Sequence, residues 1–293
     1  MTDTVLILAG EEDTQARHVA QALTGRGAHP VLLDPARLAT AARLSVTLRP
    51  DGARRLTAGV LDLDLDDLAS VWFRRLGPPA PPQAGVSATL AGLWDGLGCT
   101  AVPARPVAVL RARYKLLQLL TAERAGLDVP ATLVTTDPDE CLRFYLENGG
   151  RIVSTELDGD VPPGAGHAPG PLLAQAYPER RLSVRVIVVG ERVFAAEIHV
   201  AGSRRWVRPH RLPTGVGDAC HDLVGRLDLC YGAVDLALTP DDRYIFAEVN
   251  PTGGYLLIEE ATRLPITPAL CDLLLRRQGE GGDLSPGAGP GSP

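Results

Sequence analysis

Short apolar runs alternate with amphipathic stretches along the first third of the chain. Residues 4–10 and 29–34 are mostly apolar and predict two buried strands. Between them, apolar residues recur at helical spacing over 14–23, and Asp13 or Thr14 is a suitable helix N-cap. Because strand, helix and strand are joined by short loops, this segment predicts a parallel sheet.

The pattern changes in the second half, where hairpins replace the strand–helix–strand order. A helix over 108–125 leads to a strand at 131–135, and two segments, 172–200 and 231–251, have the pattern of antiparallel hairpins. The sequence therefore predicts α/β structure followed by α+β structure. The other predicted elements are a hairpin at 42–63, strands at 68–77 and 151–157, and helices at 141–150, 217–230 and 265–278.

Composition narrows the class of protein. Of the 293 residues, 45% are hydrophobic and 22% are charged, which is typical of a globular protein. No apolar run approaches the roughly 20 residues of a membrane-spanning helix, so we expect no membrane partner. The net charge of −6, without an evident basic face, argues against nucleic acid as a partner. The five scattered cysteines and the lack of a signal-peptide pattern lead us to expect free thiols in the cytoplasm.

Lys115 is the only lysine in the chain, although Lys and Arg together number 29. One explanation is codon bias toward arginine, which one lysine has survived by chance. The other is that this position requires the compact, flexible charge of lysine, which the planar fork of arginine does not reproduce.

The hairpin at 231–251 contains a candidate metal site. Asp235 lies on its first strand, and Glu248 and Asn250 lie two positions apart on the second, which places them on one face. The turn can bring Asp235 beside them. Two carboxylates and an amide oxygen make a hard oxygen site that suits Mg²⁺, with water and phosphate oxygens as further ligands. The alternative is a polar strand end followed by an ordinary Asn-Pro turn.

Four stretches, in the same order, resemble the ATP-grasp ligase superfamily. The segment YGAVDLALTPDDRYIFAEVNPTGGYLLIEEATRLPI, residues 231–266, resembles the C-terminal core of these ligases. Residues 70–75 resemble the end of the preceding domain, 114–138 the helix and strand that lead into the nucleotide-binding subdomain, and 175–198 the hinge strand and the hairpin after it. The resemblance is strongest to the microviridin or graspetide branch of ribosomal peptide maturases and to glutamate ligases that modify protein termini.

The resemblance implies an ATP-grasp fold with a pre-ATP-grasp domain in front. The implied parts are an α/β domain at 1–106, a small nucleotide-binding subdomain at 107–180, a large C-terminal subdomain at 181–277 and a disordered Gly/Pro-rich tail at 278–293. The resemblance also makes a homodimer plausible.

The same resemblance implies ATP and Mg²⁺ as cofactors, with ATP between the two subdomains. Arg185 falls on the catalytic arginine that contacts the γ-phosphate and the acyl phosphate, and Lys115 falls on the first of two ATP-binding lysines. The implied hinge residues, which meet adenine largely through their backbone, are Gln175, Ala176 and Tyr177. The implied metal ligands are Asp235, Glu248 and Asn250.

The chain departs from the family pattern at the strand 151–157. The second ATP-binding lysine belongs here, but Ser154 or Thr155 stands in its place, and Arg151 is one candidate to replace it. Ser183 also stands where an acidic residue is usual. The missing lysine removes one cation from the phosphate site.

Two groups of residues are candidate substrate contacts. Arg74 and Arg75 end a strand at the carboxyl edge of the parallel sheet, where α/β folds often bind ligands. The second group could hold a carboxylate or a peptide and consists of Arg204, Arg205, Trp206 and Arg208. The alternative in both cases is solvated surface residues.

The favoured hypothesis is an ATP-dependent carboxylate–amine or carboxylate–hydroxyl ligase that acts through an acyl phosphate. By resemblance, its substrate is a ribosomally made peptide in natural-product (RiPP) biosynthesis. Two alternatives stay open: a ligase for a small carboxylate or an amino acid, and a degenerate ATP-grasp protein that binds a peptide or a partner without catalysis.

Overall fold

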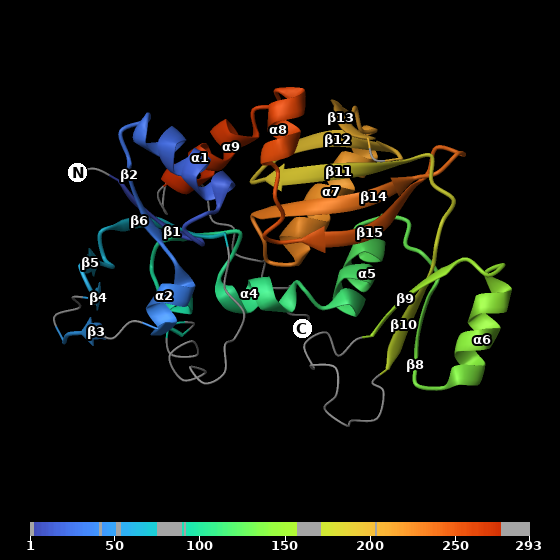
Figure 1. The fold of residues 1–293 in the computed structure, drawn as a ribbon, viewed down its shortest axis with the longest axis horizontal. Coiled ribbons are helices and arrows are strands. Elements are labelled where there is room, and N and C mark those ends of the chain that lie inside the picture. The colour runs from blue at the N-terminus through green and yellow to red at the C-terminus, as the bar shows by residue number, and fades with distance from the viewer. Residues whose placement is uncertain are drawn as a thin grey trace, which may run out of the picture. The chain divides into compact units, whose positions relative to one another are not determined.

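Two compact units make up the chain in the computed structural model (Figure 1). Residues 1–109 and 267–293 belong to the first unit, and residues 110–266 form the second. The structure describes residues 3–40, 43–50, 54–74, 90, 92–156, 171–202 and 204–276. The predicted tail at 278–293 lies outside the described residues.

The first unit is built on a four-stranded sheet. Its strands lie in the order β2 (His29–Leu33), β1 (Thr4–Leu8), β6 (Leu68–Phe73) and β7 (Thr100–Val102), and all neighbours are parallel. The parallel sheet predicted from the sequence is therefore confirmed. Helix α1 (Thr14–Thr24) connects β1 and β2, and the side chain of Asp13 caps it by accepting from the backbone N–H of Ala16 at 2.9 Å.

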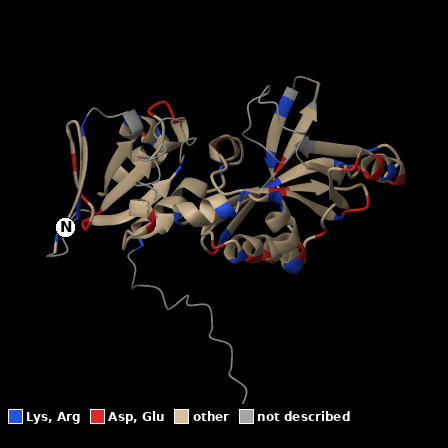
Figure 2. Cartoon of the chain, turned by 90° about the horizontal axis from the view of Figure 1, so that it is seen from below, with Lys and Arg blue, Asp and Glu red and all other residues tan. Residues whose placement is uncertain are grey.

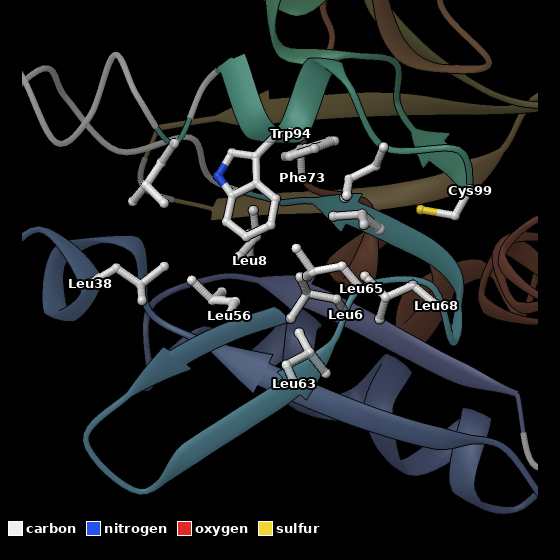
Figure 3. Packing of buried hydrophobic residues seen from close by; sticks show 13 residues of the cluster. Leu6, Leu8, Leu38, Leu56, Leu63, Leu65, Leu68, Phe73, Trp94 and Cys99 are labelled. Atoms are coloured by element: carbon white, nitrogen blue, oxygen red, sulfur yellow. The ribbon is translucent and has the colours of Figure 1, made fainter. Parts of the chain in front are cut away.

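A small antiparallel sheet extends this unit and closes its core. It consists of β3 (Leu44–Leu48), β4 (Arg54–Ala58) and β5 (Leu61–Asp64), which is the hairpin expected at 42–63 with one more strand. The leucines of β4 and β5 meet those of β1 and β6 in one apolar cluster with Phe73 and Trp94 (Figure 3). Helix α2 (Pro35–Thr40) is short and contributes Leu38 to the same cluster.

Helix α9 (Ile266–Leu275) groups with the first unit, apart from its first residue. Arg26, which follows α1, donates to Asp272 at 2.6 Å, and Thr100 of β7 donates to the carbonyl of Arg276 at 3.2 Å. The sequence-based boundaries placed this helix in a C-terminal subdomain at 181–277. The first unit is thus formed by two separate segments of the chain.

The second unit contains a five-stranded antiparallel sheet. The strand order is β13 (Arg204–Pro209), β12 (Arg192–Ala201), β11 (Leu182–Val189), β14 (Tyr231–Leu238) and β15 (Tyr244–Asn250). Helix α7 (Thr214–Arg226) packs on one face, where Val224 lies against Gly232. Helix α8 (Leu256–Thr262) follows β15.

A three-stranded antiparallel sheet and helix α6 (Pro138–Glu147) also belong to the second unit. The sheet has the order β8 (Thr132–Thr135), β10 (Leu172–Ala176) and β9 (Ile152–Glu156), and α6 follows β8. Within the described ranges, no helix is long and apolar enough to cross a membrane.

The helix predicted over 108–125 is two helices, α4 (Pro106–Arg111) and α5 (Lys115–Arg124). Tyr114 separates them because its backbone is extended, with φ −66° and ψ 112°. The carbonyl of Ala112 in this break accepts a hydrogen bond from the side chain of Gln118 at 2.8 Å. Helix α5 therefore begins at Lys115.

Candidate functional site

Three neighbouring strands bring one row of charged side chains together. The register pairs Arg185 of β11 with Asp235 of β14, and Asp235 with Glu248 of β15. Asn250 pairs with Ala233 and lies on the same face as Glu248, since side chains alternate along a strand. The sheet thus collects on one face the four residues that the sequence predicted for phosphate and metal.

A β-bulge at Ala247 decides which way Glu248 points. The register pairs Leu236 with Phe246 but Asp235 with Glu248, so Ala247 is an extra residue between them. If the register at Leu236 continued unbroken, Ala247 would face Asp235, and Glu248 would point to the opposite face. The bulge is therefore required to place both carboxylates side by side.

Arg185 and Asp235 form a bidentate ion pair. Nε of Arg185 lies 2.6 Å from Oδ1 of Asp235, and Nη2 lies 2.5 Å from Oδ2. Only 28% of the arginine side chain and 24% of the aspartate side chain are exposed. The hydrogen bonds to Asp235 raise the pKa of Arg185, so the guanidinium stays charged. A metal ion at Asp235 must therefore compete with Arg185 for the same oxygens.

Lys115 lies close to this row. It begins α5, and its ammonium group donates to the backbone carbonyl of Ala247 and lies 5.9 Å from the ring centre of Phe246. Burial lowers the pKa of Lys115, and the charges of Glu248 and Asp235 act in the opposite direction. The one lysine of the chain thus stands beside both predicted metal carboxylates.

We expect the free energy of unfolding of the wild type to rise relative to that of Lys115→Met as the solution becomes alkaline. Below the lowered pKa, Lys115 is charged in both states and the cost of its burial is fully present. Between that pKa and the ordinary value of 10.5, the unfolded chain binds more protons, so stability increases with pH. Urea unfolding of both proteins at neutral pH and at about pH 10 measures the difference. Since no other lysine titrates, a difference independent of pH would contradict the lowered pKa.

The turn after β15 fixes Asn250. Its side-chain oxygen accepts from the backbone N–H of Thr252 at 3.0 Å, and the Tyr231 hydroxyl donates to the carbonyl of Gly253 at 2.6 Å. A Cβ atom at Gly253 would lie 2.5 Å from that of Ala233, so only glycine fits here. This is the Asn-Pro turn of the alternative interpretation. The Thr252 hydroxyl also donates to the Asn250 side-chain oxygen at 3.4 Å, so a metal ion must displace this weak bond to bind there.

The predicted hinge residues lie at the end of β10. Gln175 donates from its side chain to Thr132 Oγ1 at 3.2 Å. The backbone N–H of Ala176 donates to the carbonyl of Ala131 at 2.8 Å, and that of Tyr177 donates to the carbonyl of Arg151 at 2.9 Å. Arg180 stacks on the exposed ring of Tyr177 at 5.2 Å. Their contact with adenine stays a prediction.

Ser154 and Thr155, which stand in place of the second lysine, lie on β9. Ser154 is exposed and pairs with Ala174, and Thr155 pairs with Leu173. Arg151, the candidate replacement, lies 3.9 Å from Glu179 with both side chains more than 60% exposed. An exposed pair of this kind is weak, so Arg151 is able to exchange partners.

Arg74, one of the two predicted substrate arginines of the first unit, is bound within the protein. Arg74 is largely buried, and its Nε lies 3.4 Å from Oδ2 of Asp13, the N-cap of α1. This ion pair fits a structural role better than a contact with substrate. Arg75 lies outside the described residues.

The predicted group around Trp206 does not share one face of the sheet. Arg205 and Trp206 are consecutive residues of the regular strand β13, so they point to opposite faces, and Arg208 lies on the face of Trp206. The ring of Trp206 stacks on His199 with 5.1 Å between ring centres. Nothing is described of the side chain of Arg204. A single clamp made of all four residues is therefore not formed by β13 alone.

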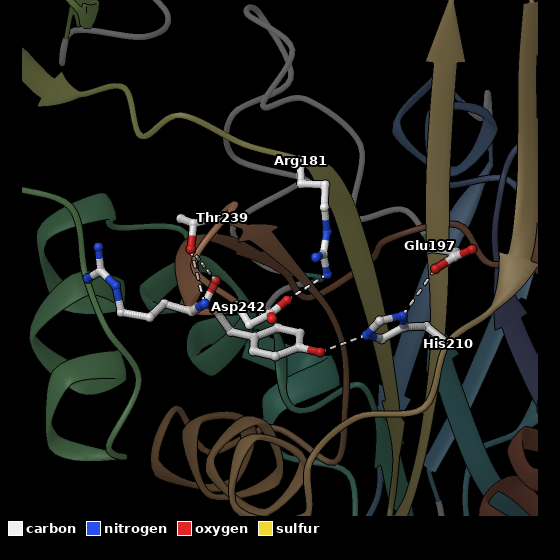
Figure 4. A network of polar contacts seen from close by, with 7 residues as sticks. Arg181, Glu197, His210, Thr239 and Asp242 are labelled. Atoms are coloured by element: carbon white, nitrogen blue, oxygen red, sulfur yellow. Dashed lines mark hydrogen bonds and ion pairs between the residues drawn. The ribbon is translucent and has the colours of Figure 1, made fainter.

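A polar network that the sequence did not predict lies on the face opposite Arg185, because Glu197 pairs with Val184. Figure 4 shows Glu197 and His210 of this network. The oxygens of Glu197 lie 2.8 Å from Nε2 of His199 and 3.3 Å from Nδ1 of His210, and Nε2 of His210 lies 2.8 Å from the Tyr244 hydroxyl. Burial alone would raise the pKa of Glu197, but the bonds to the two histidines outweigh it and lower that pKa. Only the strand register joins these residues, which are scattered in the sequence.

The row on β11, β14 and β15 fits Mg²⁺ by its donor chemistry. Asp235 and Glu248 supply carboxylate oxygens and Asn250 supplies an amide oxygen, which are hard ligands. Among the described residues, no three His, Cys, Asp or Glu side chains gather as a ready-made metal site. A cation here therefore needs further ligands, such as phosphate oxygens and water.

Over the rest of the molecule, acidic and basic residues are interspersed in the view of Figure 2.

Comparison with solved structures identifies the fold. The macrocyclase MdnC from Microcystis aeruginosa MRC, bound with precursor peptide MdnA, has a TM-score of 0.80 and 25% identity over 93% of this chain and 99% of its own. The macrocyclase MdnB from the same organism has a TM-score of 0.80, 27% identity and the same coverage. The ATP-grasp ligase PsnB, complexed with minimal precursor, Mg and ADP, has a TM-score of 0.76 and 21% identity over 94% of this chain and 98% of its own. No protein-family model and no curated protein sequence matches the chain.

The fold is that of the ATP-grasp ligase superfamily, as the four sequence stretches predicted. Within the superfamily, the chain is similar to the ligases of ribosomal peptide maturation, and the predicted resemblance to that branch is confirmed.

Proposed function

We propose that this protein is an ATP-dependent ligase that modifies a ribosomally made peptide. The observation that supports this most is the row of Arg185, Asp235 and Glu248 on one face of a sheet, in a chain that matches two macrocyclases over 93% of its length. The prediction of a peptide-modifying ATP-grasp ligase agrees with these comparisons.

The proposed reaction has two steps. A carboxylate oxygen of the peptide forms a bond to the γ-phosphorus of ATP, and ADP leaves. An amine or hydroxyl of the peptide then forms a bond to the acyl carbon, loses its proton, and phosphate leaves. Such reactions depend mainly on positioning and on neutralising the charge of the phosphates.

The residues of the row have separate tasks in this proposal. Asp235, Glu248 and Asn250 hold Mg²⁺, which supplies positive charge beside the phosphate oxygens when bound. Arg185 leaves Asp235 and presents its two donors to the transferred phosphoryl group. Lys115 adds a cation at the start of α5, and Gln175, Ala176 and Tyr177 form the adenine side of the ATP site.

A second candidate function is peptide binding without catalysis. The exposed Ser154 in place of a lysine favours it, because the phosphate site has one cation fewer than the family pattern. A cytoplasmic location, which the need for ATP and the five cysteines support, fits both functions. All five cysteines lie in the described part of the chain, and none forms a disulfide there.

The experiment that tests the proposal begins with calorimetric titration of ATP and a non-hydrolysable analogue, with and without Mg²⁺. The protein is then incubated with ATP, Mg²⁺ and a synthetic peptide rich in Thr, Ser, Asp and Glu, taken from a short reading frame beside its gene. A ligase produces ADP and lowers the peptide mass by one water for each bond. Peptide binding without ADP formation would favour the non-catalytic function instead.

A further inference from the structure

The outer edge of β15 is covered by residues 115–128. In the described part of the chain, β15 is the last strand of the five-stranded sheet, so no further strand of the sheet pairs with its outward backbone groups. The N–H of Phe246 donates to the carbonyl of Asp128 at 2.7 Å, and Lys115 donates to the carbonyl of Ala247. Helix α5, which lies next to β15 in Figure 1, supplies the next contacts through Gln118.

Gln118 takes the place of a neighbouring strand at Val249. Its Nε2 donates to the carbonyl of Val249 at 2.8 Å, and its Oε1 accepts from the N–H of the same residue at 3.2 Å. The second amide proton goes to the carbonyl of Ala112 at 2.8 Å. Only 5% of Gln118 is exposed, so water does not readily replace these bonds.

Val249, the residue that Gln118 binds, lies between two predicted metal ligands. Val249 follows Glu248 and precedes Asn250, and its side chain is buried on the other face of the sheet. The bulge at Ala247 leaves the register of this strand dependent on local contacts, and a slip of one residue would turn both ligands away from Asp235. Lys115 and Gln118 hold the backbone on the two sides of Glu248.

We infer that Gln118 is a positioning residue of the metal site: its side-chain amide fixes the backbone of Val249 and thereby aims Glu248 and Asn250 at Asp235. This inference rests on the proposed function, because it requires a metal ion at that row. It adds a residue that touches neither metal nor nucleotide. Residues that orient metal ligands typically affect metal affinity by about 10–100-fold.

The test compares Gln118→Met with Thr121→Val in the full chain. Met keeps the length of the side chain and removes all three bonds. Thr121 is a matched control, because it is buried on the same helix and donates only within it, to the carbonyl of Leu117 at 2.7 Å. For each protein, Mn²⁺ binding in the presence of a non-hydrolysable ATP analogue is measured by electron paramagnetic resonance, and analogue binding without metal is measured by calorimetry.

We expect Gln118→Met to weaken Mn²⁺ binding by about 10–100-fold while metal-free analogue binding stays unchanged. Thr121→Val should match the wild type in both. Equal Mn²⁺ affinities in the two variants would overturn the positioning role and leave the proposed function intact. Absence of metal-dependent binding in the wild type would overturn both. If Gln118→Met does not fold, Gln118→Glu, which retains the acceptor for Val249, is measured against the same outcomes.

Discussion

Replacing Glu248 by glutamine should abolish metal-dependent nucleotide binding and lower ligase turnover by on the order of 10²–10³-fold. Glu248 pairs with Asp235 across β14 and β15, and the change removes one of only two carboxylates in the row. Since Glu248 is exposed and glutamine has the same shape, the free energy of unfolding should change by no more than about 0.5 kcal/mol.

The matched control is Glu123→Gln, which removes an equally exposed carboxylate from α5 at a position with no proposed role. Calorimetry with the ATP analogue and Mg²⁺, together with ADP release in the presence of peptide, gives both readouts. If folded Glu248→Gln binds Mg²⁺ and the ATP analogue as tightly as the wild type, Glu248 is not a metal ligand. The alternative interpretation, a polar strand end followed by an Asn-Pro turn, would then be favoured.

Arg185→Ala should have opposite effects on turnover and on metal binding. Loss of the guanidinium should lower turnover by about 10³-fold, as for other arginines that stabilise phosphoryl transfer. Because both oxygens of Asp235 are then released from the ion pair, Mn²⁺ should bind the nucleotide-free protein roughly tenfold more tightly. The free energy of unfolding should fall by about 1–3 kcal/mol, since the pair is mostly buried.

Arg181→Ala is the control for this variant. It removes the arginine directly before β11, whose partner, Asp242, lies 2.7 Å away in an exposed pair. Turnover and metal affinity should therefore both stay near the wild-type values. If Arg185→Ala binds Mn²⁺ no more tightly than Arg181→Ala, then Arg185 does not compete with a cation for Asp235.

The sequence predicted that Asp235, Glu248 and Asn250 lie together because local rules were sufficient for most of this row. The spacing of Glu248 and Asn250 gives a shared face directly, and the turn between β14 and β15 returns the chain to Asp235. The strand–helix–strand pattern likewise predicted the parallel sheet of the first unit. Arg185 was found only through the resemblance, since nothing in its own strand distinguishes it from a surface arginine.

Other features depend on contacts that no local pattern contains. The period of two along β15 does not reveal the extra residue at Ala247, although that residue decides the direction of Glu248. Gln118 has the sequence appearance of an exposed helical residue, and its burial follows from a partner 131 positions away. The extended backbone of Tyr114 divides a segment whose apolar spacing suggested one helix.

The error of grouping Arg205 with Trp206 could have been avoided from the sequence. Consecutive residues of a strand point to opposite faces, so these two side chains do not lie together. Had 204–209 been recognised as a strand, the sequence alone would have placed them on opposite faces. The network around Glu197 needed the pairing of three strands and the segment after β13, so it was not accessible in the same way.

The order of synthesis delays the folding of both units. The first unit needs α9, and the second needs β14 and β15, which are all made late in translation. The row requires β15, so no nascent chain that ends before residue 250 contains it. The first unit receives α9 only after residue 267. Both units therefore become complete within the same short stretch of translation, long after their first strands have left the ribosome.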